Sequence, residues 1–374
     1  MQRFLAIFVK EIRQLRRDRL SLGMLFLVPV LLLALYGYAL SFDVKHIPVA
    51  VLDEDATRAS REFLESLFSN PYFDRVLTLD RRADADAVLD RGRARFVLVI
   101  PRGFAQRLAR GETAEVQALV DGADASSAGA AVGYLDALAA RATRRVQIET
   151  IQRAGIAPSL PLVALVPRIW FNPDQESSHF LIPGLISMLM MLAAVIATSL
   201  SIVRERERRT LEQILVSPVR PMELILGKTL PYVLVGVATM GLILLLGRIA
   251  FGVTVAGSWW LLSLTTLVFL FSALGMGLMI SSITRSQQVA FQLATILTLL
   301  PSFLLSGLIF PIRSMPVFHQ VFSLFFIPRH FVTALRAIML KGAGFAEIWP
   351  SLAAMLALGL FFNGIALWRT RRSM

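Results

Sequence analysis

Long runs of residues without charge constrain this chain more than any other feature of its sequence. Residues 180–203, 229–247 and 249–284 contain no Asp, Glu, Lys or Arg. A helix needs about 20 predominantly apolar residues to cross the roughly 30 Å hydrocarbon core of a bilayer. The sequence therefore predicts a membrane protein of mainly α class with six transmembrane helices, at residues 20–42, 180–203, 229–250, 258–283, 287–311 and 348–368.

The basic residues predict how these six spans are oriented. Residues 1–19, 204–228, 285 and 369–374 contain 16 Lys or Arg, whereas the short loops on the opposite side contain five. Because cytoplasmic loops are enriched in Lys and Arg, we expect both termini in the cytoplasm. The same pattern accounts for the net charge of +12 without nucleic acid, since no RNA- or DNA-binding motif accompanies the basic residues.

The N-terminal segment predicts a helix at the membrane surface followed by the first span. In residues 1–19 the apolar and basic side chains separate onto two helical faces. The apolar face contains Phe4, Leu5, Phe8, Val9, Ile12 and Leu15, and the basic face Arg3, Lys10, Arg13, Arg16 and Arg17. Residues 20–42 are interpreted as an uncleaved span, because the apolar core of a signal peptide is only about 7–15 residues long.

Residues 43–178 differ sharply in composition and predict a small extracytoplasmic α/β domain between the first and second spans. We expect strands at 47–52, 75–79, 95–100 and 115–120, alternating with helices at 57–69, 83–90 and 101–110. Residues 125–152 predict a long Ala-rich helix, and four prolines between 158 and 173 mark the return to the membrane.

No catalytic or metal site is predicted in this chain. The carboxylates of Asp53, Glu54 and Asp55 could suggest a cation site, but consecutive acidic residues at a strand end are more typical of a solvated turn. The four histidines are dispersed, the chain has no cysteine, and no serine nucleophile motif is present.

The charged segment 204–228 lies between two predicted spans and contains six Lys or Arg. Leu211, Ile214 and Leu215 share a helical face, and Pro218 and Pro221 then end the helix. A short amphipathic helix at the inner membrane surface is suited to docking a soluble partner. The alternative is a basic loop that only sets the orientation of the spans.

Residues 314–328 form an uncharged run that is too short to cross the bilayer and is broken by Pro316. Together with residues 308–311 they predict a re-entrant or interfacial pair of helices on the outer side, a candidate exit gate. The alternative is an amphipathic loop that packs on the outer domain.

The sequence contains no energy source of its own. Gly227-Lys228-Thr229 lacks the glycine that a phosphate-binding loop needs five positions earlier, where Met222 stands. Glu347 is the only acidic residue in 229–374, so the spans contain no chain of carboxylates for proton transport. A motor, if present, belongs to another chain.

Two motifs and the order of segments resemble the permease subunits of bacterial ABC-2 type exporters across essentially the whole chain. The first motif is Thr210-Leu211-Glu212, Ser217-Pro218, Glu223 and Gly227-Lys228, although Arg209 stands where the family commonly has glycine. The second is Ser306-Gly307, Phe310-Pro311 and Met315-Pro316, with Gln320, Pro328 and Arg336.

This resemblance implies a multi-pass permease of the bacterial inner membrane that exports a hydrophobic or amphipathic substrate. It implies a dimer with an identical or sister permease, bound to separate ATPase subunits that carry ATP and Mg²⁺, so this chain needs no cofactor or metal. Members with a large outer domain often work with a periplasmic adaptor and an outer-membrane channel. The alternative is a non-transporting membrane sensor with an extracytoplasmic receptor domain.

Three groups of residues follow as candidate functional sites. The coupling helix, residues 204–223, would contact the ATPase through Glu205, Thr210, Leu211, Glu212, Ile214, Leu215, Ser217, Pro218 and Glu223. The outer re-entrant region, residues 306–330, would gate the exit with Ser306, Gly307, Phe310, Pro311, Met315 and Pro316. A substrate path within residues 179–374 would be lined by Met188, Met191, Gln292 and Phe303.

Overall fold

The computed structural model divides the chain into two compact units. Residues Phe42–Arg168 form an α/β unit, and Met1–Ser41 with Ile169–Met374 form a helical unit. The structure describes residues 2–39, 46–69, 72–122, 128–129, 132–140, 143, 170–171, 176–208 and 221–373.

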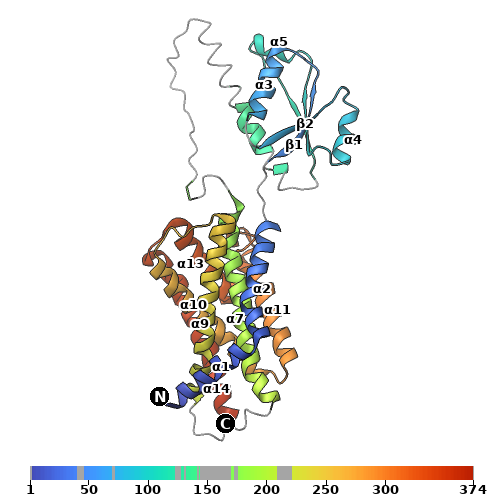
Figure 1. Ribbon diagram of the computed structural model, residues 1–374. Helices are drawn as coiled ribbons and strands as arrows, with labels where there is room; N and C mark the ends of the chain where they lie inside the picture. The colour runs from blue at the N-terminus through green and yellow to red at the C-terminus, as the bar shows by residue number, and fades with distance from the viewer. Residues whose placement is uncertain are drawn as a thin grey trace. The chain divides into compact units, whose positions relative to one another are not determined.

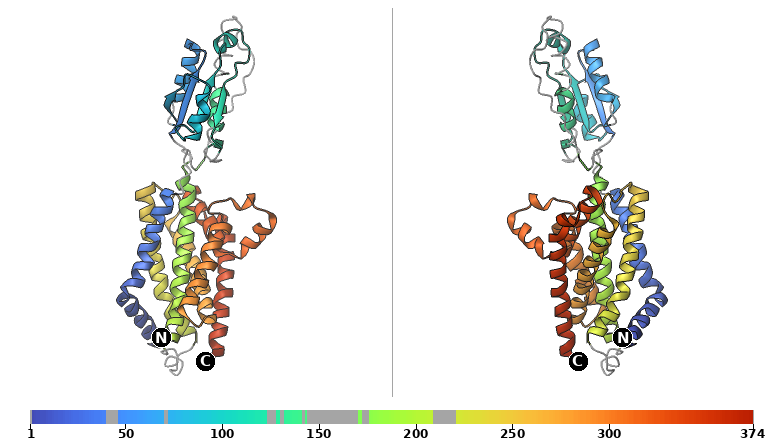
Figure 2. Two further views of the ribbon diagram at one scale, coloured as in Figure 1. Left: turned by 90° about the vertical axis from the view of Figure 1, so that its right-hand side faces the viewer. Right: turned by 90° about the vertical axis from the view of Figure 1, so that its left-hand side faces the viewer.

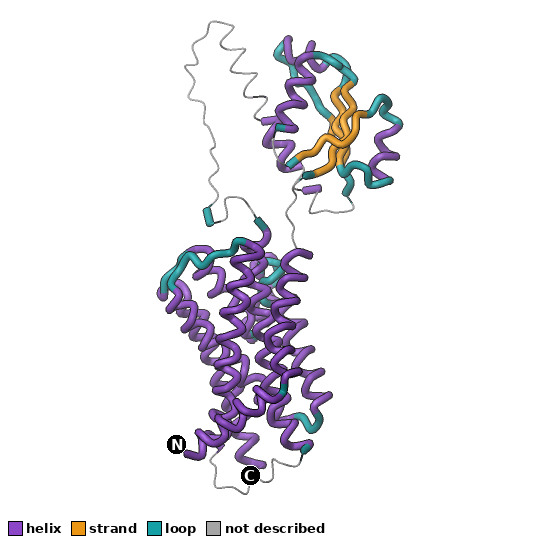
Figure 3. The backbone as a smooth tube through the Cα atoms, in the orientation of Figure 1, coloured by secondary structure: helices purple, strands orange, loops and turns teal. Residues whose placement is uncertain are grey.

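The α/β unit is a four-stranded sheet with helices on both faces (Figure 3). The strands are β1 (Ile47–Asp53), β2 (Phe73–Thr78), β3 (Phe96–Ile100) and β4 (Gln117–Val120), in the order β2-β1-β3-β4. β1 pairs in parallel with β2 and β3, whereas β4 is antiparallel to β3. The two central strands are almost entirely buried, as expected for parallel strands covered on both sides.

Three short helices provide that cover. α3 (Arg58–Phe68) and α5 (Phe104–Ala109) lie on one face of the sheet and α4 (Asp84–Asp90) lies on the other (Figure 1). Their buried side chains pack against the strands on those two faces. This alternation confirms the predicted α/β fold, with every strand and helix through residue 120 found within a few positions of its expected range. The predicted helix 125–152 lies mostly outside the described residues, which include helical residues 132–140.

The helical unit is a bundle that includes helices long enough to cross a membrane. Within the described residues, five helices have that length and composition: α7 (Ser177–Glu207), α9 (Pro221–Phe251), α10 (Trp259–Ile283), α11 (Gln287–Leu305) and α14 (Phe345–Ser373). Each overlaps a predicted span, but α11 ends at Leu305, so the predicted span 287–311 was too long at its C-terminal end. The break between α9 and α10 at residues 252–258 also confirms the predicted division of a long uncharged stretch.

The sixth span stays a prediction. α2 (Arg19–Ala39) occupies the predicted first span, but its described apolar part, Leu25–Ala39, is shorter than the other five helices. Another candidate is the pair formed by residues Val317–Phe325 and α13 (Ile327–Lys341), which is bent by 93°. A bend of this size is compatible with a broken span or with the predicted re-entrant pair.

Both termini lie at the same end of the bundle, here called the terminal end (Figure 2). α7 and α9 meet the terminal end at residues 207 and 221, while α10 and α14 begin at the opposite, distal end. α7 and α10 are the central helices, and in each of them 72% of an apolar stretch of 18 residues is buried. α1 (Gln2–Arg17) lies across the terminal end and packs on α9.

Candidate functional site

The last turn of α7, Arg204–Glu207, joins four other helices at the terminal end; we call it the α7 junction. The Arg204 guanidinium pairs with Asp18, between α1 and α2, at 2.9 Å. Arg206 donates to the carbonyl of Thr284, which ends α10. Glu207 accepts the backbone N–H of Gln287, the first residue of α11, at 2.7 Å. The last turn of α7 is therefore held by contacts to several other helices, immediately before the chain leaves α7 at residue 208.

Glu205 occupies the buried centre of this junction. Its carboxylate pairs with the Lys228 ammonium of α9 at 2.8 Å and with Lys10 of α1. Lys228 also pairs with Glu11 at 3.0 Å, and the side chains of Glu11, Glu205 and Lys228 are all less than 5% exposed. Two carboxylates thus face two ammonium groups, which offsets the high cost of removing these charges from water.

Neutral polar groups extend the charged cluster into the bundle. The Lys228 ammonium lies 3.3 Å from the hydroxyl of Ser201, one turn before Glu205 on α7. The Ser201 hydroxyl also interacts with Tyr232 of α9. Burial alone would lower the pKa of Lys10, but the Glu205 and Glu11 carboxylates outweigh that effect and raise it above the ordinary value. Lys10 therefore stays charged at neutral pH.

The Gly227-Lys228 pair has a packing function in this structure rather than a phosphate-binding one. A Cβ atom on Gly227 would lie 2.8 Å from the Ile7 side chain of α1, closer than atoms can approach. The absence of a side chain at Gly227 lets α1 and α9 touch, and the ammonium of the next residue, Lys228, lies in the charged cluster between the two helices. The motif thus places α1 against the helix that follows the coupling segment.

The structure brings together only part of the predicted coupling site. Thr210, Leu211, Glu212, Ile214, Leu215, Ser217 and Pro218 lie outside the described residues. Glu223 is half-buried in the first turn of α9. Glu205 is only 3% exposed, so its side chain contacts neighbouring helices rather than the protein surface.

Sequence reasoning missed Lys10, Glu11, Ser201 and Lys228 as members of one site. A signal was available, because Lys228 is the only charged residue between Glu223 and Arg248 and a charge within an apolar helix needs a partner. On α1 the buried side chains include Glu11 and Leu15, whereas Leu5 is 56% exposed.

At the distal end a second site is built around Arg336 of α13. Its guanidinium donates to the carbonyls of Phe180 (2.9 Å), Gly307 (2.8 Å) and Leu308 (3.2 Å). The same group lies 3.6 Å from the centre of the Phe180 ring, a cation–π contact. One side chain thus joins α13, the start of α7 and the turn after α11; we call this the Arg336 site.

The predicted gate residues divide into a buried and an exposed group around this turn. Ser306 and Gly307 are buried, and a Cβ on Gly184 of α7 would overlap Leu308, so the turn lies directly against α7. Phe310, Pro311 and Pro316 are exposed and Met315 is half-buried. The chain then forms the short helix α12 (Val317–Phe322), which projects beside the bundle (Figure 2, orange).

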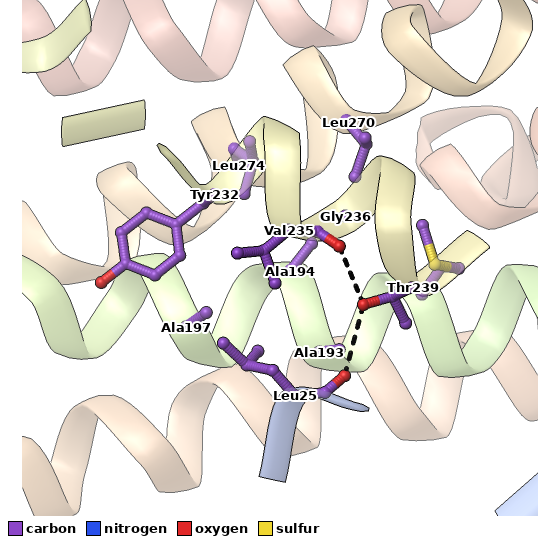
Figure 4. Close-up of a pocket in the computed structure, with 11 residues that line it drawn as sticks. Leu25, Ala193, Ala194, Ala197, Tyr232, Val235, Gly236, Thr239, Leu270 and Leu274 are labelled. Carbon is purple, nitrogen blue, oxygen red and sulfur yellow. Dashed lines mark hydrogen bonds between the residues drawn. The ribbon is translucent and has the colours of Figure 1, made fainter. Parts of the chain in front are cut away.

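The predicted path residues do not line a common channel in this conformation. Met188 and Met191 are fully buried in the bundle core, Gln292 is exposed on α11, and Phe303 packs edge-on against Tyr36. A cavity of about 20 Å³ does lie between α2, α7, α9 and α10 (Figure 4). It has room for about one water molecule, whereas ligand pockets measure roughly 300–1,000 Å³.

That cavity shows how closely the four helices approach one another. Thr239 of α9 donates to the carbonyl of Val235 at 2.9 Å and reaches the carbonyl of Leu25 of α2 at 3.5 Å (Figure 4). The opposite wall is formed by small residues of α7, including Ala193, Ala194 and Ala197. A larger path along this seam would require α7 and α9 to separate.

The acidic turn of the α/β unit is more ordered than the sequence suggested. Asp53 accepts the N–H of Ala56 and the hydroxyl of Ser60, and Asp55 accepts the N–H groups of Gly103 and Ala105. The hydrogen bond from the Thr57 hydroxyl, and after it those from the backbone N–H groups, lower the pKa of Asp55 below its ordinary value. These carboxylates tie two loops together, and within the described residues no group of His, Asp or Glu could hold a metal ion.

Comparison with known proteins places these features in a family context. Residues 19–368 match the family described as ABC-2 family transporter protein. The chain is 34% identical to "Probable multidrug ABC transporter permease YbhS" of Escherichia coli K12 over 376 residues, which cover 100% of this chain and 98% of that protein. It is 31% identical to "Probable multidrug ABC transporter permease YbhR" of the same organism, over 93% of each chain. "ABC transporter G family member 20" of Dictyostelium discoideum is 28% identical over 58% of this chain and 30% of that protein.

Proposed function

Because this chain belongs to the ABC-2 family of transporter proteins, we propose that it is the membrane-spanning permease subunit of an ATP-driven exporter. A separate ATPase subunit would supply the energy, and a hydrophobic or amphipathic molecule would move outward. The similarity to multidrug permeases supports this substrate class. A match along the full length of transporter permeases favours export over the sensor alternative.

The α7 junction is the observation that carries this proposal. Glu205 lies three residues before residue 208, where the chain leaves α7, and Lys228 lies seven residues after α9 begins at residue 221. Their ion pair therefore holds together the end of α7 and the start of α9, the two helices that the coupling segment connects. A force on the segment would reach α1, α9, α10 and α11 through side chains already in contact.

The proposed mechanism follows from this connection. The ATPase subunit docks on residues 204–223, and its nucleotide states push differently on that segment, which is the condition for any population shift. The push tilts α7 and α9, and the tilt opens a path that the described conformation keeps closed. At the distal end, α7 begins beside the turn that Arg336 holds, so the same movement would act on residues 306–316.

Further parts of the proposal concern the assembly around the chain. The permease works as a dimer with an identical or sister chain, with both termini in the cytoplasm of a bacterial inner membrane. The common end of both termini and the positive charge beside the spans support this orientation. A periplasmic adaptor and an outer-membrane channel would extend the route in cells that have two membranes.

Replacing Leu211 and Ile214 together by Asp tests the docking role. Two carboxylates on the apolar face of the segment should abolish co-purification of the ATPase from membranes, because an apolar contact cannot accommodate them. Val216→Asp is the matched control, since helical periodicity places Val216 off that face. The permease should stay monodisperse in the double variant and in the control. Retention of the ATPase at wild-type yield by the double variant would contradict the proposal.

A further inference from the structure

An apolar groove runs between α10 and α14, away from both sites described above. It measures about 350 Å³ and is open to the outside of the bundle. Every residue that forms it is apolar: Leu264 and Val268 from α10, and Phe345, Trp349, Leu352, Ala353 and Leu356 from α14. A groove of this size lies in the range of small-molecule binding sites, which are mostly apolar.

The depth of the groove matches one leaflet of a bilayer. Its α14 wall runs from Phe345 to Leu356, and eleven residues at 1.5 Å each give a depth of about 16 Å. Half of the roughly 30 Å hydrocarbon core is about 15 Å. Exposed Trp259, Trp260 and Trp349 near the start of α10 and α14 are typical of residues at the membrane–water interface. The groove therefore begins at the interface and ends near the middle of the membrane.

Two charged residues lie close in sequence to Phe345, where the α14 wall of the groove begins. Lys341 and Glu347 are the only charged residues between positions 341 and 356, and both are exposed. Lys341 ends α13, and the Ala256 N–H donates to the Met339 carbonyl at 3.0 Å, so the end of α13 lies against the start of α10. Lys341 therefore lies on a segment close to where the two groove helices begin, and its long side chain is of a kind that places a charged head group beside apolar surface.

We propose that this groove binds one phospholipid molecule, with an acyl chain between α10 and α14 and the phosphate at Lys341. The apolar wall complements the hydrocarbon, its depth complements the length of one leaflet, and the cation complements the phosphate. A second permease chain could also cover the groove, but that contact would explain neither why its depth matches one leaflet nor why a cation lies near its start. The site does not depend on the direction or the energy source of transport.

Two alanines on α14 allow a matched test. Ala353 lines the groove, whereas Ala357, one turn further along α14, is also exposed but does not line it. The purified full chain would be analysed by native mass spectrometry after exchange into detergent. We expect one retained phospholipid per chain in the wild type and in Ala357→Phe, and at least a tenfold lower occupancy in Ala353→Phe. Lys341→Gln should lower the occupancy several-fold.

A second measurement covers the case in which Ala353→Phe does not fold. Trp349 lines the groove, whereas Trp368 lies on the same helix outside it and is also exposed. Two variants would each keep one of these as the sole tryptophan, and in membranes of brominated phospholipid both should be quenched. After transfer to unbrominated detergent, only Trp349 should stay quenched.

Three results would overturn the proposal. Equal lipid retention in the two phenylalanine variants, or equal loss of quenching at both tryptophans, would mean that only ordinary surrounding lipid contacts the groove. A disulfide that links two chains of an Ala353→Cys variant would mean that a second copy covers it.

Discussion

The two ends of the helical bundle are fixed by different chemistry. At the α7 junction, side chains of opposite charge pair with one another in a buried cluster that includes Glu11, Glu205 and Lys228. At the Arg336 site, one guanidinium donates to backbone carbonyls of two other segments. A buried charge cluster is costly to break at any one member, whereas the distal turn depends on a single residue. The difference suggests a permanent connection at the terminal end and a releasable one at the distal end.

Removal of Lys228 should have the largest effect. Lys228→Met leaves the Glu205 and Glu11 carboxylates buried with only Lys10 nearby, which should destabilise the protein by about 3–5 kcal/mol. Thermal unfolding in detergent, followed by the yield of monodisperse protein, measures this loss. Arg285→Met, which removes an exposed cation at the same end, should change stability very little. Equal behaviour of the two variants would mean that the buried cluster stabilises the terminal end no more than an exposed cation does.

A substitution at Arg336 should have a smaller but still clear effect. Arg336→Gln loses a charged donor to three carbonyls, which should cost about 2–3 kcal/mol and loosen the turn at Gly307 and Leu308. Arg336→Lys keeps the charge but not the planar fork, so it should restore only part of the loss. Hydrogen–deuterium exchange of residues 305–312 measures the loosening. Unchanged exchange in Arg336→Gln would mean that packing alone holds the turn.

The close helix contacts at the two ends can each be tested by replacing one glycine with alanine, which adds a single methyl group. Gly227→Ala would press on Ile7 of α1, and Gly184→Ala would press on Leu308. Each should destabilise by about 1–3 kcal/mol, the usual cost of overpacking. Gly241→Ala is the control, because a Cβ there meets nothing within 4 Å and alanine favours the helix. Thermal unfolding of the three variants should separate the control from the other two.

The smallest effect is expected at Asp55 in the α/β unit, where a carboxylate accepts backbone N–H groups in a solvated setting. Because hydrogen bonding lowers the folded-state pKa of Asp55, its contribution to stability is present above the unfolded value of about 3.9 and is lost as pH falls through the lower folded value. Asp55→Asn should remove this pH dependence and speed hydrogen exchange at residues 103–105 slightly at neutral pH. A wild-type exchange profile that matches Asp55→Asn at every pH would contradict this.

Local patterns in the sequence predicted most of the fold. The uncharged runs gave five helices of spanning length, and the alternation of short strands and helices gave the α/β unit. β2 begins at Phe73 rather than the expected residue 75 because Phe73 is buried in the core against Phe96. That contact depends on tertiary packing, which a local pattern does not contain.

The candidate site was harder to predict because its partners are far apart in the chain. Glu11, Glu205 and Lys228 are separated by up to 217 positions, and each alone is typical of a charge at a membrane surface. Glu205 was therefore assigned to an external contact, although it is buried. Arg336 was recognised only through a family motif, and its three carbonyl partners depend on a turn whose geometry the sequence does not specify.

The central claim is that the α7 junction transmits force from the ATPase to the distal end. Spin labels on cysteines introduced at the exposed positions Leu226 and Val317 would report the distance between the two ends in the complex isolated from membranes. We predict an ATP-dependent change in this distance that disappears in Glu205→Gln/Lys228→Met, while the ATPase remains bound. The same ATP-dependent change in the double variant would contradict the account.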